Sequence, residues 1–224
     1  KEAKSIADSD IVKDDGKSTE TPTVTYKAYQ IGDSVTLKDG TTWHVIEASD
    51  SKTETVTLFA DKNFKSDGSE WSNKTSECDD YKLEFDTNNS NVYETSSIKD
   101  FLENKVRPYI NNSLTSAVGT SINSIRLITV DEICSIINNA DSNNDCTLDK
   151  AYYDSNGFKR LIEAFSNVPE WLYSTYYWTM TPGASNFTDV YYVFPASAIG
   201  IFVAHHDGAI GARPVIVTLK SNIK

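Results

Sequence analysis

The sequence has few basic residues and no long apolar run. Its 21 lysines and arginines are outnumbered by 32 aspartates and glutamates, which gives a formal net charge of −11, and no stretch concentrates the basic residues. Nucleic acids and anionic membrane surfaces repel such a chain, so we expect neither as a partner. No apolar run approaches the roughly 18 residues that a membrane-spanning helix needs. We therefore expect a globular domain that makes no membrane contact of its own.

The sequence also lacks the short motifs of common enzyme classes. It contains no G-x-S-x-G elbow, no phosphate-binding glycine loop and no H-E-x-x-H metal motif. His205 and His206 are neighbours, so on a strand they point to opposite faces and do not share a metal ion. We interpret His44 as a histidine at the edge of the core. Carboxylates are plentiful, but their spacing marks no pair. We therefore predict no catalytic residues and a protein that is not an enzyme.

Aromatic and β-branched residues are concentrated near the C-terminus. Four apolar runs follow Trp171, with turn residues between them: residues 177–180, 191–194, 199–204 and 212–220. Short runs of this kind at near-regular spacing predict an antiparallel meander of four strands. We expect the rest of the chain to pack against this meander.

Three residues of the C-terminal region are expected to be structural. Trp178 stands in an apolar run, so we predict that it lies in the core and contacts no ligand. Arg213 has neighbours that face a core, so we predict that it is buried and bonded to backbone carbonyls or to a carboxylate. Pro214 has no backbone N–H to donate, which places it at a sheet edge or a bulge.

The N-terminal half contains a predicted hairpin. Residues 34–37 and 41–47 flank an Asp-Gly pair at 39–40, which is typical of tight hairpin turns. In the second strand Trp43 and Val45 share one face, because side chains alternate along a strand.

A third strand and a long insertion follow. Residues 55–60 alternate threonine with apolar side chains, and we expect this strand to pair with its neighbours in the chain. Residues 61–91 are mostly polar, with Trp71 isolated among them. An insertion of this length in a compact domain is expected to be either functional or mobile.

Three helices are predicted in the middle of the chain. The first begins at 96–97, and Pro108 is expected to kink or end it. The second begins at Thr129, where Glu132 completes a capping box. The third spans about residues 155–165, on the evidence of its apolar spacing. Strands, then helices, then strands predict an α+β fold with an antiparallel sheet and about three helices.

The three cysteines are Cys78, Cys134 and Cys146. A disulfide between Cys134 and Cys146 closes a short loop and suits an exported protein, so we rank it first. Unpaired thiols rank second. A structural zinc ion bound by all three cysteines and one histidine ranks third, because no C-x-x-C pair is present.

One local pattern resembles the start of a calcium-binding loop. Oxygen-bearing side chains occupy loop positions 1, 3, 5 and 9, namely Asp141, Asn143, Asp145 and Asp149. Cys146 replaces the glycine of the sharp turn, and Tyr152 replaces the bidentate glutamate. We therefore favour a polar loop over a calcium site, and we expect no cofactor.

Several segments together resemble a family of secreted domains from Gram-positive bacteria. The family's typical sequence motifs are IGD followed by W-x-V-I, Y-x-x-S-x-I, V-R-L-I-T-x-x-E, Y-W-x-x-x-P and G-x-R-P-V-x-x-L-K-S. This chain reads IGD, WHVI, VYETSSI, IRLITVDEI, YWTMTP, VYYVF and GARPVIVTLKSNI, in that order. The resemblance covers about residues 28–223.

The resemblance also implies a fold. The R-L-x-T-x-x-E and G-x-R-P segments look like those of formylglycine-generating enzymes, which have an irregular C-type-lectin-like fold. The activity of those enzymes is not implied here, because their redox-active cysteines lie in the C-terminal third. No cysteine follows Cys146 in this chain.

Many relatives in this family carry a type IV pilin-like leader and a hydrophobic first helix. A chain that starts just after such a helix would begin much like KEAKSIADSDIV, and it starts at Lys1 without an initiator methionine. We expect residues 1–25 to be a tether and residues 26–224 to be a single surface domain. A flexible tether of any exported protein fits the same residues.

The leading hypothesis from the sequence is an extracellular, non-enzymatic display or adhesion domain on the cell surface or on a type IV pilus. Its expected partners are other surface or pilus subunits, or a ligand on a host or another surface. The alternative is a secreted enzyme acting on cell-wall or surface glycans. An enzyme should show a concave pocket with convergent polar groups and perturbed acids, and a display domain should show a tyrosine-rich face.

Overall fold

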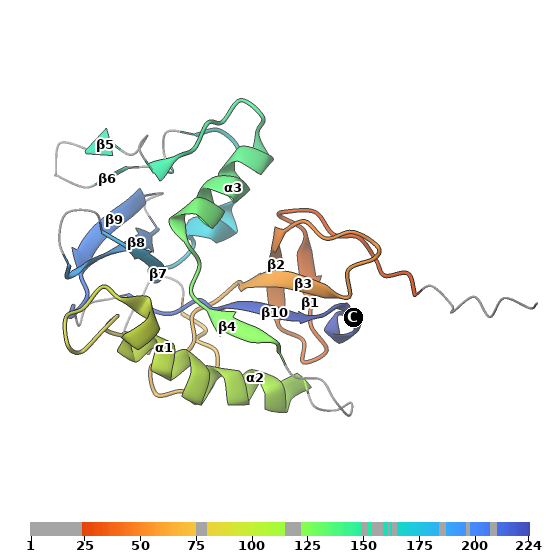
Figure 1. The fold of residues 1–224 in the computed structure, drawn as a ribbon, viewed down its shortest axis with the longest axis horizontal. Coiled ribbons are helices and arrows are strands. Elements are labelled where there is room, and N and C mark those ends of the chain that lie inside the picture. Colours follow the sequence, from red (N-terminus) through yellow and green to blue (C-terminus); the bar gives the residue numbers. More distant parts are fainter. Residues whose placement is uncertain are drawn as a thin grey trace, which may run out of the picture.

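The computed structural model describes residues 24–74, 80–114, 122–148, 152–153, 159–160, 162, 165–183, 187–195, 198–206 and 210–224. It has an α+β fold built on antiparallel sheets, as the sequence predicts (Figure 1). None of the helices in these ranges is long and apolar enough to cross a membrane.

The larger sheet has five strands in the order β1-β2-β3-β10-β4. Their bounds are β1 Ser34–Thr36, β2 Thr42–Glu47, β3 Thr55–Ala60, β4 Ser124–Arg126 and β10 Val215–Leu219. The hairpin and the third strand predicted from the sequence form β1, β2 and β3. Gly40 has φ +92° in the turn, a conformation that glycine adopts without the steric cost of a side chain.

The second sheet has three strands in the order β7-β8-β9. Their bounds are β7 Tyr177–Pro182, β8 Asp189–Phe194 and β9 Ala198–Val203. The predicted four-stranded meander is therefore correct for three strands and wrong for the fourth. The last run becomes β10, which pairs with β3 on one side and β4 on the other. Pro214 lies just before β10, so its missing N–H interrupts no strand pairing.

The first helical segment runs without a break past Pro108. It consists of α1 (Ser97–Phe101), a π-helical turn (Leu102–Val106) and α2 (Arg107–Leu114). Proline crowds the carbonyl four residues earlier, and the wider π-helical turn accommodates that crowding. Pro108 therefore distorts the helix and does not end it.

The second helix, α3 (Val130–Ala140), begins as predicted. Thr129 accepts a hydrogen bond from the Glu132 N–H, and the Glu132 side chain accepts one from the Thr129 N–H, which completes the capping box. Arg126 also donates to Glu132, at 2.8 Å between Nη1 and Oε2. The capping glutamate is thereby tied to the end of β4.

The third predicted helix, over 155–165, is wrong at the residues the structure describes. Lys159–Arg160 forms strand β6 and pairs with β5 (Tyr152–Tyr153). Short helices are marginal on their own, and strand pairing prevails over a weak helical period here. Residues 154–158, 161 and 163–164 of this region lie outside the described residues. Single 3₁₀ turns also lie at Tyr93–Thr95, Glu170–Tyr173 and Lys220–Asn222.

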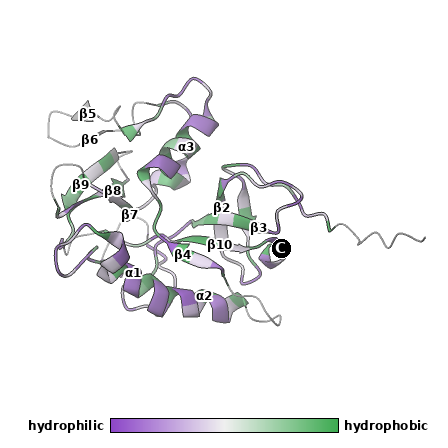
Figure 2. Ribbon diagram, viewed as in Figure 1, coloured by the Kyte–Doolittle hydropathy of each residue, from purple (hydrophilic) through white to green (hydrophobic). Residues whose placement is uncertain are grey.

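Two cores lie on opposite faces of the five-stranded sheet, because side chains alternate along its strands. The first core lies between the sheet and α1–α2, and it includes Trp43, Val45, Leu58, Ile98, Leu102, Ile110, Trp178 and Tyr192. The second core lies beneath α3, and it includes Ile46, Phe59, Ile133, Ile137, Tyr177, Tyr191 and Val215. Figure 1 shows α1 and α2 on one side of β4 and β10, with α3 on the other. The side of α1 and α2 that faces the viewer in Figure 2 is mainly hydrophilic.

The described parts of the long insertion, 61–74 and 80–91, are anchored in the first core by aromatic side chains. Phe64 and Phe85 are fully buried, and Tyr81 is as well. Trp71 packs edge-on against Trp43, with ring centroids 5.4 Å apart. The insertion therefore contributes to the wall of the domain and positions the site described next.

Candidate functional site

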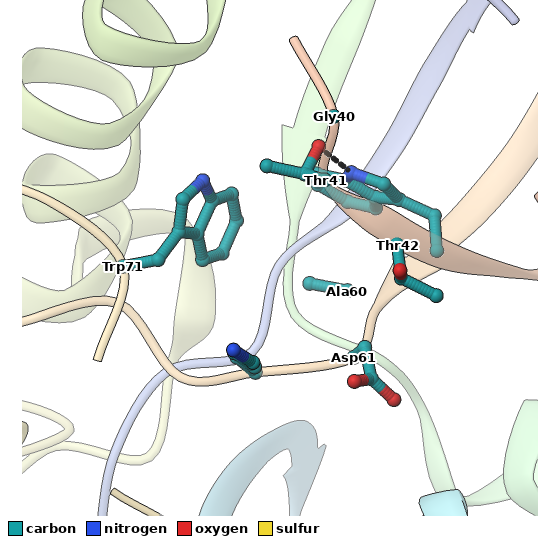
Figure 3. Close-up of a pocket in the computed structure, with 8 residues that line it drawn as sticks. Gly40, Thr41, Thr42, Ala60, Asp61 and Trp71 are labelled. Atoms are coloured by element: carbon teal, nitrogen blue, oxygen red, sulfur yellow. Dashed lines mark hydrogen bonds between the residues drawn. The ribbon is translucent and has the colours of Figure 1, made fainter. Parts of the chain in front are cut away.

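A hollow of about 250 Å³ opens beside the β1–β2 turn (Figure 3). It is lined by residues 40–43 from the turn and β2, by 60–62 from the end of β3, and by Trp71 from the insertion. Figure 3 shows Trp71 on one side of the hollow, Thr41 on the other and Ala60 between them. Trp43 is fully buried behind Thr41, whereas Trp71 is partly exposed.

Short hydrogen bonds fix the turn side of the hollow. Asp39 accepts hydrogen bonds from the Thr41 N–H at 2.9 Å and from the Thr41 hydroxyl at 2.6 Å. The Thr41 hydroxyl oxygen in turn accepts from Trp43 Nε1 at 2.7 Å. Ser113 of α2 donates to the second Asp39 oxygen at 2.8 Å. This chain of bonds links the turn, the core tryptophan and the helix, so that wall is pre-organised.

A buried histidine lies against Asp61 at the edge of the hollow. His44 Nε2 lies 2.9 Å from Asp61 Oδ1. The His44 ring stacks on Trp171, with centroids 4.0 Å apart and planes inclined by 4°. His44 Nδ1 is buried and has no hydrogen-bond partner among the described residues. One ring nitrogen of His44 therefore faces Asp61, and the other faces the protein interior.

Arg213 lies fully buried near the same histidine. Its Nε donates to the Ala60 carbonyl at 2.9 Å and its Nη1 donates to the Trp171 carbonyl at 2.8 Å. The guanidinium carbon lies 4.3 Å from the centre of the Phe59 ring and 4.9 Å from that of Tyr177. Desolvation lowers the pKa of Arg213 to about 10, so the side chain remains a cation at neutral pH.

Asp61 is held in its ionised form. The hydrogen bond from His44 lowers the pKa of Asp61, and the positive charge of Arg213 lowers it further, against the opposing effect of partial burial. An ionised carboxylate accepts hydrogen bonds but has no proton to donate. Every described carboxyl group with a resolved pKa shift has its pKa lowered: Asp50, Asp61, Asp67, Glu132 and Asp141. None of them has the raised pKa that a general acid requires.

The candidate calcium residues are only partly brought together. Asp141 follows α3 and accepts hydrogen bonds from the backbone N–H and side-chain amide of Asn143, each at 2.9 Å. Its second oxygen accepts from the Asn167 amide at 2.8 Å. Asp145 lies in the same loop, and Asp149 lies outside the described residues. No group of three acidic, histidine or cysteine side chains with metal-binding geometry occurs in the described ranges.

The predicted disulfide between Cys134 and Cys146 is present, with the two Cα atoms 5.0 Å apart. It joins the buried side of α3 to the loop that follows the helix. The zinc alternative needs both of these sulfur atoms as free thiolates, and the disulfide takes them. Cys78 lies outside the described residues.

The other residues that the sequence analysis named make contacts with neighbouring parts of the protein. Trp178 is fully buried, and its Nε1 donates to the Leu83 carbonyl at 2.7 Å. Arg213 is buried and bonded to two backbone carbonyls, which is the arrangement expected for it. His205 lies 3.0 Å from a Glu84 oxygen, whereas His206 stacks on Phe202. The two neighbouring histidines therefore do not meet at one site.

Sequence reasoning missed the residues that shape the hollow. Asp61 and Trp71 lie in a segment that reads as a polar insertion, and their partners are far away in the chain. The Asp-Gly turn at 39–40 was the one local signal for this position, because it fixes where Thr41 must lie.

Comparison with protein families, with curated proteins and with solved structures finds no match to this chain. The resemblance to secreted Gram-positive domains therefore stays a prediction from the sequence.

Proposed function

We propose that this protein is an extracellular, non-enzymatic display or adhesion domain on a cell surface or a type IV pilus. The observation that carries the proposal is the chemistry of the hollow. Among the described residues that line it, Asp61 is the one carboxylate, its pKa is lowered, and the neighbouring His44 is buried and stacked on Trp171. The hollow therefore offers hydrogen-bonding groups, and its one described carboxylate is ionised and does not serve as a general acid.

Two further observations support the location. The Cys134–Cys146 disulfide suits an oxidising compartment outside the cytosol. The net charge of −11 suits a protein whose partners are surface subunits or surface ligands and not nucleic acid. A C-type-lectin-like fold, a tether over residues 1–25 and a single domain over residues 26–224 complete the proposal.

The alternative is a secreted enzyme that acts on cell-wall or surface glycans. Asp61 and the partly exposed Trp71 line the same hollow, which favours this alternative, because glycoside hydrolysis uses carboxyl groups and an aromatic face can pack against a sugar ring. Glycoside hydrolysis generally needs two carboxyl groups across the scissile bond. The described residues lining the hollow supply one, so the binding function has the stronger support.

The experiment that tests the proposal locates the protein and assays it together. Intact native cells are treated with protease, and an antiserum against residues 24–224 follows the protein in cells and in purified pili. We expect loss of the signal from intact cells and no turnover on a panel of glycans and peptides. Recovery from the cytoplasm would overturn the proposal. Hydrolysis that is lost in Asp61→Asn would establish the enzyme alternative.

A further inference from the structure

The hollow beside the β1–β2 turn has a size that suits one ring-sized group. Its volume of about 250 Å³ is below the range of about 300–1,000 Å³ that is usual for pockets enclosing whole small molecules. A hollow of this kind holds one unit of a larger ligand, while the rest of that ligand extends along the surface. Because Ala60 lies between the two walls, a ring can enter without displacing a large side chain.

The lining combines one aromatic surface with polar groups of both kinds. Trp71 is partly exposed and offers the apolar surface of an indole ring. Thr42 and Lys62 are exposed and provide a hydroxyl group and an ammonium group. The carboxylate of Asp61 shares Oδ1 with His44, which leaves Oδ2 available to accept a ligand hydroxyl. The site thus presents donors, an acceptor and one flat apolar surface.

The charges of these groups select against ionic ligands. A simple anion that meets Lys62 is also repelled by Asp61, and a simple cation that meets Asp61 is repelled by Lys62. An apolar peptide side chain would desolvate both charges without bonding to either. A neutral ring with several hydroxyl groups donates to the carboxylate and accepts from the ammonium. It also lays its C–H face against the indole, which carries partial negative charge on its face.

We infer that this hollow binds one hexopyranose unit of a surface polysaccharide, with Trp71 as the stacking platform and Thr42, Asp61 and Lys62 as the hydroxyl-binding rim. The inference rests on the proposed binding function and names its ligand class. The hydrogen bonds that fix Thr41 and Trp43 hold the turn wall in place before the ligand arrives, which lowers the ordering cost of binding. The polysaccharide comes either from the bacterial wall or from a foreign surface, and the chemistry of the ring is common to both.

The test measures binding of the whole chain to defined probes. Insoluble peptidoglycan sacculi represent the wall source, immobilised mucin represents a foreign surface, and a set of apolar peptides represents the competing ligand class. We expect retention on at least one of the two glycan probes. Thr42→Val, which removes the hydroxyl group and keeps the shape, should weaken that binding about fivefold to tenfold, the effect of one lost hydrogen bond. Trp71→Leu should weaken it at least as much.

Phe187→Ala is the matched control, because Phe187 is an aromatic side chain with 93% exposure outside the hollow. It should bind as the unchanged protein does. A nuclear magnetic resonance titration with a soluble muropeptide or mucin glycan adds a readout that does not depend on folding of a variant. The chain has four tryptophans, and the indole N–H signal of Trp71 should shift while that of core Trp178 stays in place.

Three results would overturn the inference: retention on neither glycan probe, glycan binding that is unchanged by both Thr42→Val and Trp71→Leu, or retention on peptides alone. Each of them leaves the proposed function standing if the protein is still found on the cell surface without turnover. Cytoplasmic location, by contrast, removes the proposed function whatever the probes show. The two proposals therefore fail separately.

Discussion

The two cores of this domain are closed by different means. The first core is filled by Trp43 and Trp178, whose indole N–H groups donate to nearby oxygen atoms. The second core is also packed, but it adds a disulfide at α3 and a buried cation, Arg213, between two aromatic rings. The same sheet thus separates a core stabilised by buried apolar volume from one that is also stabilised by a disulfide and a buried guanidinium.

The difference follows from what covers each face of the sheet. The first core is covered by α1 and α2, which form one continuous helical segment with the π-helical turn between them. The second is covered by the shorter helix α3, and the disulfide ties that helix to the loop after it. The buried guanidinium of Arg213, which donates to two carbonyl groups, adds a second link on this side of the sheet. Four of the following five predictions test the contrast between volume and links, and the last tests the charge beside the hollow.

The largest effect is expected from Trp178→Ala in the first core. Removing a fully buried indole leaves a cavity and an unpaired Leu83 carbonyl, which should lower the free energy of unfolding by about 3–5 kcal/mol. Urea unfolding measures the change. Phe187→Ala is the control, and it should stay within about 0.5 kcal/mol because Phe187 is exposed. Equal free energies of unfolding for the two variants would contradict the view that buried apolar volume stabilises the first core.

The next effect is expected from the double substitution Cys134→Ser and Cys146→Ser. The disulfide spans a sequence separation of 12, and losing a link of that length should lower the free energy of unfolding by about 3 kcal/mol. Hydrogen exchange should rise more in α3 than in α2, because the link acts on the second core. Thiol titration of the unfolded, unreduced protein should count one free thiol among the three cysteines. A count of three would show that the disulfide does not form.

Arg213→Lys should lower the stability of the second core by a smaller amount. A lysine ammonium does not hold the Ala60 and Trp171 carbonyls in one planar fork, so one buried acceptor loses its partner at a cost of about 1–3 kcal/mol. Arg107→Lys on α2 is the control for a partly exposed fork: Arg107 binds Glu103 and the Ile122 carbonyl, and water can replace the bonds that it loses. If the urea midpoint falls equally in both variants, the buried guanidinium of Arg213 stabilises the fold no more than a partly exposed one.

Thr129→Ala tests the start of the helix that covers the second core. It removes the side-chain acceptor for the Glu132 N–H, and the loss of such a cap costs about 1 kcal/mol. Thr129→Ser keeps the hydroxyl group and should restore most of the stability. If serine is no better than alanine in thermal unfolding, the capping bond contributes nothing measurable.

The smallest effect concerns pH and Asp61. Its folded-state pKa is lowered, so the stability it contributes is present above its unfolded pKa of about 3.9 and is lost as the pH falls through the folded value. The carboxylate is about a third exposed, so solvent screening should hold the effect below about 1 kcal/mol. Asp61→Asn should flatten the acid side of the stability profile as the pH falls below about 5. An unchanged profile would show that His44 and Arg213 do not stabilise the charge.

The local elements could be predicted from the sequence because each depends on neighbouring residues. The turn at 39–40, strand β3 and the capping box of Thr129 and Glu132 all follow from contacts within a few positions. The burial of Trp178 and Arg213 was also predictable, since both lie in apolar runs. The Cys134–Cys146 link followed from a short separation.

What the sequence by itself determined is therefore the class of each strong element and the α+β composition of the domain. Only the tertiary structure decided that β10 leaves the meander for a place between β3 and β4 in the other sheet, because alternation shows which faces of a strand are buried and not which strand lies beside it. The tertiary structure also determined where the hollow forms. Asp61 contacts His44, which is 17 positions away in the chain, and Trp71 of the insertion packs against Trp43 of β2. These contacts form between residues with no local pattern in common, since it is the packing of the two cores that brings them together.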